Sequence, residues 1–473
     1  MDLQPILALE QEQGGALAGQ GPAYTIDAAA FKEGECASDV IAAALKEHDY
    51  VIIPRVNFVL MLNRSIALAS GKRLSVHPDT TLQLMPGCGG CMVRNENIFD
   101  GRHVPCPEEK NDHDILVEGG IWQFGGSHAS PFEESEVILE VDKSATKLFD
   151  ADGNETNVAG SEGEGGAFLG VFFFCNARNF TIRKATVRRC NFYAVLIAGG
   201  SHFVIEDMYY DHNKMDGVHV NGPSSYGLIQ RLQGKCGDDF VALNAWDWKD
   251  SAVSFGAIHH MLIQDLDCAG DELRLLPGRK TYRDGKQSQC PISDCFYRRV
   301  HNAYCVKMYQ QPNCMNDLTG EIDKSDIAGE ISRVWFQDVA LDALTGTGLG
   351  EVKVEALFEI IADCEDITYE NIRIGLDEES FRNAGMRLVE VGPKSSTWKR
   401  GFTDPKMWAE LFDTSPNVHA NNLTFKNITF AGQKSVDRET IIGCHSLTVN
   451  NDYPNTTPKG GTGKGSLGTV VIE

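Results

Sequence analysis

A short phrase recurs along this chain, and its spacing restricts the folds that the chain can adopt. Each copy is a strand-like run, a polar or charged residue where a bend is expected, and a second short alternating run. The copies are DILVEGGIW at 114, NFTIRKATV at 179, HFVIEDMYY at 202, YGLIQRLQG at 226, HMLIQDLDC at 260, RVWFQDVAL at 333, DITYENIRI at 366 and NLTFKNITF at 422. Many starts are about 23 to 34 residues apart, within the range of solenoid repeats.

The alternation of apolar and polar residues in these copies predicts strands rather than helices. A unit of about two dozen residues with two or three short strands fits one coil of a parallel β-helix. The alternative, a sandwich of hairpins, would need tight turns every 8 to 12 residues or so. Asn-Gly stands between strand-like runs only at Asn221-Gly222. We therefore predict an all-β chain that folds as a single-stranded parallel β-helix.

The domain organisation is predicted from the segments that contain the recurring phrase and the segments that lack it. We predict an N-terminal extension over residues 1–24 and one β-helix domain over residues 25–473. The run ASDVIAAALKEHD (37–49) predicts a helix with Ser38 or Asp39 as N-cap, which would cover the open end of the solenoid. Residues from about 280 to 325 and from 380 to 415 lack the phrase and are predicted to be loop insertions.

The charge and the apolar segments restrict the partners of the chain. A formal net charge of −23 argues against nucleic acid and an anionic membrane. The longest apolar runs, such as FLGVFFFC (168–175), are too short to cross a bilayer. The first residues, MDLQPILALEQEQGG, do not have the pattern of a signal peptide, so we expect a cytoplasmic protein, or a secreted one if a longer chain has been trimmed.

The 14 cysteines are expected to be reduced thiols, most of them packed in the core. Two groups could bind zinc, but their irregular spacing favours buried or loop thiols. The first group is Cys88, Cys91, His103 and Cys106, and the second is Cys290, Cys295, Cys305 and Cys314.

Three aspartates stand about one coil apart, each beside or near a glycine: Asp216, and the adjacent pair Asp238 and Asp239. In a parallel β-helix, residues one coil apart stack at about 4.8 Å, so the sequence predicts three clustered carboxylates. Like charges raise one another's pKa and leave one group protonated near neutral pH. A protonated carboxyl group beside ionised ones is what hydrolysis of a glycosidic bond requires. A calcium site and solvated turn residues are the alternatives.

The motifs around these aspartates resemble those of glycoside hydrolase family 28, the polygalacturonases and their relatives. Lys214-Met215-Asp216-Gly217 is similar to the Asn-Thr-Asp-Gly motif of the family, and Gly237-Asp238-Asp239 followed by FVALN is similar to its second motif. The resemblance implies a right-handed helix and an inverting mechanism. It also implies that Asp238 is the general acid and that Asp216 and Asp239 hold and deprotonate the water.

Other family motifs are met only in part. Lys214 stands in place of the asparagine, and Arg274-Leu275-Leu276 matches the Arg-Ile-Lys motif only at its arginine. No His-Gly turn follows Trp248, since His259 and His260 lie in a different context.

Further residues are candidates for substrate binding. His219 lies on the Asp216 strand and could touch substrate, tune Asp216 or serve structure alone. The amide of Asn244 is expected on the same face, and Trp246 or Trp248 could form a wall against a sugar ring. Arg274 and Lys214 are the remaining candidates for substrate binding. Asn221 is expected to shape the turn with Gly222 and Pro223, and Glu272 is a rival acid or one partner of a surface ion pair.

The sequence therefore predicts an inverting glycoside hydrolase that acts on a pectin-like or related oligosaccharide or polysaccharide. No metal or cofactor is expected, because paired carboxylates need no Lewis acid. The alternatives are a β-helix lyase, epimerase or fructan-rearranging transferase, and a non-catalytic carbohydrate-binding β-helix.

Overall fold

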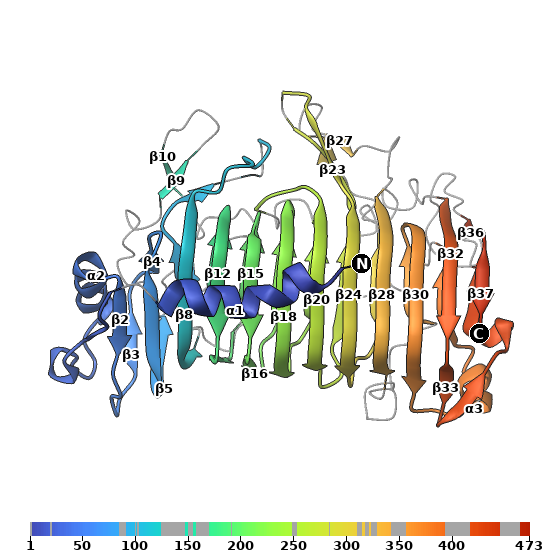
Figure 1. Ribbon diagram of the computed structural model, residues 1–473, viewed down its shortest axis with the longest axis horizontal. Helices are drawn as coiled ribbons and strands as arrows, with labels where there is room; N and C mark the ends of the chain where they lie inside the picture. Colours follow the sequence, from blue (N-terminus) through green and yellow to red (C-terminus); the bar gives the residue numbers. More distant parts are fainter. Residues whose placement is uncertain are drawn as a thin grey trace, which may run out of the picture. The chain divides into compact units, whose positions relative to one another are not determined.

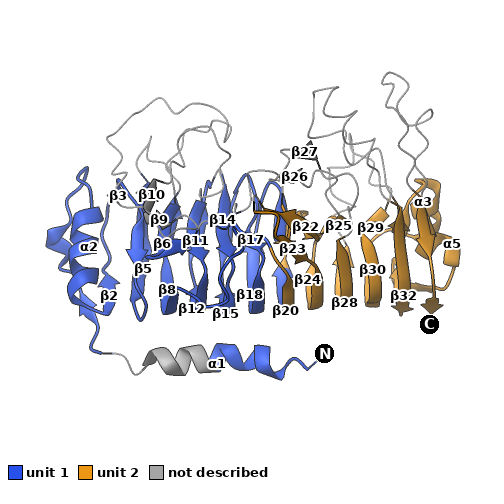
Figure 2. Ribbon diagram, turned by 90° about the horizontal axis from the view of Figure 1, so that it is seen from above, with its two compact units in different colours: residues 1–242, 250–255, 260–266 blue, residues 243–249, 256–259, 267–473 orange. Residues whose placement is uncertain are grey.

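The computed structural model describes residues 2–18, 21–84, 91–99, 101, 104–123, 147–149, 155–157, 170–190, 192–247, 253–282, 284–309, 315–316, 321–322, 329–341, 356–392, 417–444 and 464–473. The chain divides into two compact units (Figure 2). The first contains residues 1–242, 250–255 and 260–266, and the second contains residues 243–249, 256–259 and 267–473.

The first unit is built from parallel strands that return in register, coil after coil. One ladder is β1 (Tyr24–Thr25), β2 (Tyr50–Ile53), β5 (Arg73–Leu84), β8 (Asp112–Gln123), β12 (Ala177–Arg183), β15 (Ser201–Glu206) and β18 (Ser224–Gly234). The second is β4 (Ile66–Leu68), β6 (Cys91–Asn95), β11 (Gly170–Cys175), β14 (Tyr193–Ala198) and β17 (Val218–Asn221). Shorter strands are β3 (Leu60–Leu62), β13 (Thr186–Arg188) and β16 (Tyr209–Asp211).

The second unit repeats this arrangement. Its first ladder is β24 (Ile292–His301), β28 (Glu330–Leu341), β30 (Asp363–Ile374) and β32 (Val418–Lys426), which also pairs with β36 (Gly465–Leu467) and β37 (Val470–Ile472). Its second ladder is β21 (Glu272–Leu276), β25 (Val306–Tyr309), β29 (Ala356–Ile361), β31 (Arg387–Val391) and β35 (Ile442–Cys444). Strands β19 (Asp239–Asn244) and β20 (Ile258–Asp267) have residues in both units.

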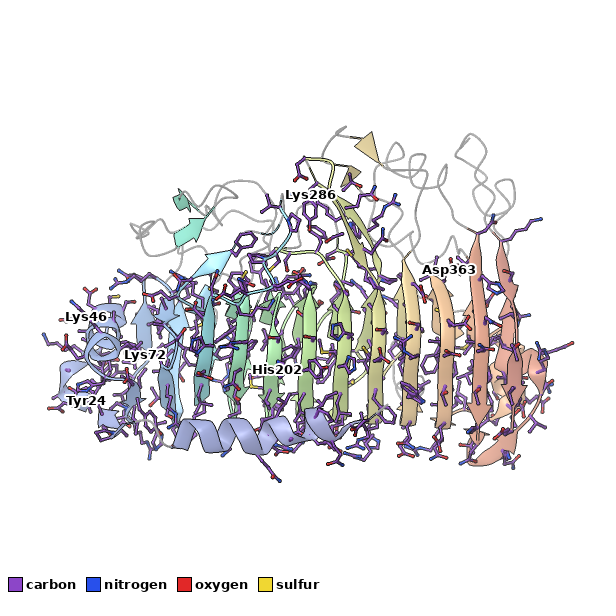
Figure 3. All side chains as sticks on the ribbon, turned by 45° about the horizontal axis from the view of Figure 1, so that its top comes forward. Tyr24, Lys46, Lys72, His202, Lys286 and Asp363 are labelled. Carbon is purple, nitrogen blue, oxygen red and sulfur yellow. The ribbon has the colours of Figure 1, made fainter. Side chains whose placement is uncertain are left out.

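Small elements accompany the coils of both units. The antiparallel pair β22 (Gly278–Thr281) and β23 (Gln287–Cys290) carries Lys286 at its turn (Figure 3). The other short elements are β7 (Ile98–Phe99), β9 (Lys147–Phe149), β10 (Glu155–Asn157), β26 (Met315–Asn316), β27 (Glu321–Ile322), β33 (Ile428–Phe430), β34 (Gln433–Ser435), α3 (Glu378–Asn383) and α5 (Arg438–Ile441).

The recurring phrase marks two bends in every copy. Its first residue has a left-handed backbone, with φ between 51° and 60°, in Asp114, Asn179, His202, Tyr226, His260, Arg333, Asp366 and Asn422. The residue five positions later is also left-handed in every copy: Gly119, Lys184, Asp207, Arg231, Asp265, Asp338, Asn371 and Asn427. Asparagine, aspartate and glycine tolerate this conformation best, and they hold many of these positions. The polar residue seen in the phrase is therefore the one that turns the chain.

Side chains at these bends contact one another from coil to coil. Asn371 Nδ2 donates to Asp338 Oδ1 at 2.8 Å, and Asn427 Nδ2 donates to Asn371 Oδ1 at 2.9 Å. In the first unit the rings of His202, Tyr226 and His260 stack with centroids 4.8 Å apart at each step; His202 is marked in Figure 3. His260 thus belongs to a bend, which agrees with the different context expected for it.

The two expected loop insertions contain regular strands, so both predictions are wrong in part. The sequence DCFYRRVHN is a further copy of the phrase, with Asp294 and Arg299 left-handed, and it forms β24. Strands β25 and β31 also fall within the expected insertions and pair as regular coil strands. Arg299 stands at the same bend as Arg231 in the copy at Tyr226. The expected boundary between the extension and a single β-helix domain stays a prediction.

The expected helix is present as α2 (Ser38–Glu47), which buries Ile41 and Leu45 and contacts β2 and β4 (Figure 1). The expected N-cap is wrong, because Ala37 holds that position without a side-chain hydrogen bond. Ser38 Oγ instead accepts a hydrogen bond from the backbone N–H of Asn63 at 3.1 Å.

A helix that the sequence analysis does not predict lies in the N-terminal extension. Helix α1 (Gln4–Ala18) runs across β8, β12, β15 and β18 (Figure 1). Ile6 and Leu9 are buried, and Glu10 Oε1 lies 3.1 Å from Arg231 Nη2. Across the described residues, no helix is both long and apolar enough to cross a membrane.

Apolar side chains fill the interior of each unit and stack from coil to coil. In the first unit Phe174, Phe180 and Phe203 stack at 4.7 and 5.4 Å. In the second unit Tyr297, Phe336, Tyr369 and Phe425 form a longer stack, with centroids 4.8 to 5.6 Å apart. Each such pair contributes about 0.5–1.5 kcal/mol beyond the area it buries.

Most described cysteines are buried free thiols, as expected. Burial raises the pKa of the Cys190 thiol from its ordinary value of 9.0 to about 12. The folded protein therefore keeps this proton in a range of pH where the unfolded chain loses it.

This difference predicts alkaline instability with a defined cause. The contribution of Cys190 is fully present below pH 9 and is lost as the pH rises toward about 12. The free energy of unfolding should fall by up to ~1.4 kcal/mol per pH unit for this one proton. Urea unfolding of wild type and Cys190→Ala, measured at several pH values above 9, would show a shallower decline in the variant. Equal slopes would contradict the assignment.

Candidate functional site

The three aspartates singled out in the sequence lie together in the first unit. Asp216 stands shortly before β17, and Asp238 and Asp239 stand at the start of β19. One carboxylate oxygen of each lies within 4.8 Å of those of the other two. Asp216 and Asp239 are buried, with 1% and 0% of their surface exposed, while Asp238 is partly exposed. The expected cluster of carboxylates is present, and Asp238 is its member that faces solvent most.

Backbone hydrogen bonds define how the two coils stack here. Gly217 N–H donates to the carbonyl of Asp239 at 3.0 Å, and the N–H of Asp239 donates to Asp216 Oδ1 at 3.2 Å. Asp239 therefore lies opposite Asp216, and Asp238 is offset by one residue. The coil stacking thus brings one oxygen of each carboxylate within 4.8 Å of the others.

Both glycines beside these aspartates are required by close packing. A Cβ on Gly217 would lie 2.7 Å from the carbonyl oxygen of Phe240 and 2.8 Å from Tyr210 Cε2. A Cβ on Gly237 would lie 2.5 Å from the carbonyl oxygen of Lys214. Real Cβ atoms do not approach backbone so closely, so each glycine allows its neighbouring coil to come near enough for the carboxylates to meet.

His219 contacts the cluster directly. Its Nδ1 lies 2.6 Å from Asp216 Oδ2, and the side chain is buried. The ring of Tyr193, on the preceding coil, stacks on the imidazole with centroids 4.0 Å apart. Of the roles considered for His219, contact with Asp216 is the one that the geometry supports.

Asn221 and Tyr193 both contact His219, and neither contact was predicted from the sequence. Asn221 Nδ2 lies 3.2 Å from His219 Nε2, and Asn221 Oδ1 accepts the N–H of Val253 at 3.3 Å. Asn221 thus does more than shape the turn before Pro223. The two-residue spacing of His219 and Asn221 on one strand places both on one face, and this signal could have identified the contact.

The other expected substrate contacts belong in part to the second unit. Lys214 is exposed, and Asn244, Trp246 and Arg274 belong to the second unit. Asn244 is fully buried. Trp246 is 2% exposed and packs against Gly278, so its ring faces protein and does not form the expected stacking wall. Trp248 lies outside the described residues.

The residues that partly match the Arg-Ile-Lys motif lie in the second unit. Arg274 is half-buried on β21, opposite Lys307 of β25. Leu276, at the position of the family lysine, is fully buried. Glu272, the rival candidate for the catalytic acid, forms an ion pair with Lys307. This agrees with the alternative interpretation, in which Glu272 is one partner of an ion pair.

The carboxylate cluster is also the one place in the described ranges with acidic, histidine or cysteine side chains spaced closely enough for a metal ion. Both oxygens of Asp216 are already in contact with nitrogen atoms, His219 Nδ1 and the backbone N–H of Asp239, which makes the cluster less suited to a cation. Zinc binds cysteine in its thiolate form. Burial raises the pKa of the Cys91 thiol and raises that of Cys106 to about 11, so the thiolate form of both residues is disfavoured. Cys88, His103 and Cys314 lie outside the described residues.

Comparison with solved structures supports the architecture. No family model and no curated protein matches the sequence. A polygalacturonase from Erwinia carotovora ssp. carotovora is similar with a TM-score of 0.50 and 13% identity, over 90% of this chain and 97% of that one. An exopolygalacturonase from Thermotoga maritima has a TM-score of 0.50 and 12% identity, over 98% and 96%. An endo-xylogalacturonan hydrolase from Aspergillus tubingensis has a TM-score of 0.52 and 12% identity, over 95% and 100%.

At such low identity these similarities concern the fold. The chain has the right-handed parallel β-helix fold of these proteins, as its repeat and its resemblance to family 28 predicted.

The packing of Gly217 generates a test of the site's geometry. Gly217→Ala should lower the free energy of unfolding by roughly 1–3 kcal/mol, because its Cβ would press on the backbone of the next coil. Gly71→Ala is the control: nothing lies within 4 Å of its Cβ, so only the strain of its left-handed backbone, about 1 kcal/mol, is expected. Urea denaturation compares the two. A Gly217→Ala protein as stable as wild type would mean that the coils are not packed this closely.

Proposed function

We propose that this chain is a glycoside hydrolase that cleaves O-glycosyl bonds by means of Asp216, Asp238 and Asp239. The observation that carries the proposal is the gathering of three carboxylates, two of them buried, with a buried histidine in contact with Asp216. Burying like charges together is costly unless one of them is protonated. Support also comes from the fold, which is that of solved structures described as polygalacturonases and a xylogalacturonan hydrolase.

The surroundings of each carboxyl group suggest its role. Asp216 accepts two N–H donors, which favours its ionised form. Asp238 is the most exposed and can reach a substrate, so it is the group proposed to donate the proton. In the reaction, the proton of Asp238 passes to the glycosidic oxygen as the bond from that oxygen to the anomeric carbon breaks. Water attacks the anomeric carbon and gives its proton to Asp216 or Asp239.

The proposed substrate is a pectin-like or related oligosaccharide with few charges near the cleaved bond. Leu276 is buried where the resembling family has a lysine, and the net charge is −23. A polyanionic chain would be repelled by such a protein unless a local group of basic residues met it. Product analysis on a panel of plant and microbial oligosaccharides, neutral and acidic, is the measurement that identifies the sugar.

A non-catalytic carbohydrate-binding β-helix is the second candidate. The burial of Asp216 and Asp239 favours it, because neither carboxylate is open to solvent. In this case, substitution of the aspartates would leave all functions of the protein intact.

Asp238→Asn separates these candidates. If Asp238 is the proton donor, turnover should fall by about 10²- to 10⁴-fold, because an amide cannot protonate the leaving group. The fold should survive, since Asp238 is partly exposed. Asp265→Asn is a matched control at a left-handed bend, a conformation that asparagine also adopts. Hydrolysis at the wild-type rate in Asp238→Asn would remove Asp238 from the mechanism.

The stereochemical course gives a second test. The resemblance to family 28 supports inversion, although nearest oxygens within 4.8 Å would also suit a retaining pair at ~5–5.5 Å. We expect the first released anomer to have the opposite configuration to the cleaved bond, as seen by NMR within the first turnovers. A retained anomer, or a covalent sugar on any of the three aspartates, would replace inversion with double displacement.

A further inference from the structure

The contacts of Asn221 specify which of its side-chain atoms faces His219. Its Oδ1 accepts the backbone N–H of Val253 at 3.3 Å, and a backbone N–H can only donate. The amide nitrogen Nδ2 is therefore the atom that lies 3.2 Å from His219 Nε2. Since an amide nitrogen donates and does not accept, Nε2 must accept and carries no proton.

A neutral imidazole without a proton on Nε2 carries it on Nδ1. This is the nitrogen that lies 2.6 Å from Asp216 Oδ2, so Nδ1–H donates to the carboxylate. The N–H of Asp239 donates to the other oxygen, Oδ1, at 3.2 Å. Asp216 is thus an acceptor at both oxygens, which is the arrangement of an ionised carboxylate.

The ring of His219 packs on the preceding coil. Tyr193 stacks on it with centroids 4.0 Å apart and planes at 29°. Leu196, its partner in register on β14, is fully buried. The imidazole is therefore fixed by packing, and its tautomer is set by Asn221.

We propose that Asn221 is a positioning residue that holds His219 as the neutral Nδ1–H tautomer, and that this tautomer keeps Asp216 ionised as the base of the site. The inference rests on the proposed function for the reaction that the base serves. It assigns Asp216 to the water and leaves proton donation to another carboxyl group of the cluster. Asn221 itself touches no reacting atom.

Asn221→Asp is the sharpest variant, because it changes one atom of the amide. One carboxylate oxygen can still accept from Val253, while the other now faces His219 Nε2 and requires a proton there. His219 then becomes protonated on Nε2. Either Nδ1 loses its proton and no longer donates to Asp216, or the ring becomes an imidazolium and weakens Asp216 as a base.

Nitrogen-15 NMR of histidine-labelled protein reads this state without any substrate. The signals of the 13 histidines are assigned by comparison with His219→Gln. In wild type we expect His219 to show a protonated Nδ1 and an unprotonated Nε2, and in Asn221→Asp a protonated Nε2. Asn176→Asp is the matched control, because Asn176 is also buried and its side chain contacts the carbonyl of Glu109 and the thiol of Cys106. It should leave the His219 signals unchanged.

Kinetics supply the second measurement. Asn221→Asp should lower kcat by about 10- to 100-fold while KM changes little, because the base is weakened and substrate contacts are kept. A proton on Nε2 of wild-type His219 would overturn the inference before any variant is made, as would Asn221→Asp signals like those of wild type. Wild-type protein with the expected tautomer but without hydrolase activity would support the positioning of Asp216 and contradict the proposed function alone.

Discussion

The hydrogen bonds between strands of successive coils are the interaction on which the rest of this structure depends. They fix the register, so each residue stands on the residue one coil earlier, at a spacing of about 4.8 Å. His219 stands on Leu196, which stands on Phe173, and the aromatic stack from Tyr297 to Phe425 arises in the same way. This register places residues of the same kind above one another in successive coils. Such stacking stabilises apolar side chains and is unfavourable for side chains of like charge. Asp216 and Asp239 are brought face to face by the same bonds that build the core.

Such a pair of buried carboxylates needs compensation, and the surrounding residues supply part of it. The backbone N–H of Asp239 donates to Asp216, and His219 donates from the other side. Gly217 and Gly237 permit the close approach that these bonds require, because a side chain at either position would meet backbone atoms of the neighbouring coil. The cluster is therefore built by the fold at several residues at once, and this is difficult to reconcile with solvated aspartates at a turn.

The parts of the structure that were predictable are those that depend on spacing within one coil. The period of the phrase predicted the strands, and the gap between Asp216 and Asp239 predicted their proximity, since both follow from the length of a coil. The copy at Asp294 was not recognised although its second bend, Arg299, is of the same type as Arg231 in the recognised copy at Tyr226. The orientation of Asn221 depends on Val253, 32 residues later, and no local pattern specifies that contact. Trp246 was misassigned since aromatic residues suit a sugar site and a core equally.

The three aspartates are alike in the sequence but are made unequal by their neighbours. Asp216 is buried between two N–H donors, Asp239 contributes its backbone N–H to Asp216, and Asp238 is displaced by one residue toward solvent. Acid–base catalysis needs this inequality, because one carboxyl group must keep a proton while a neighbour stays ionised. The contacts from Val253 through Asn221 and His219 to Asp216 are a second source of this inequality, because they act on Asp216 alone among the three carboxylates.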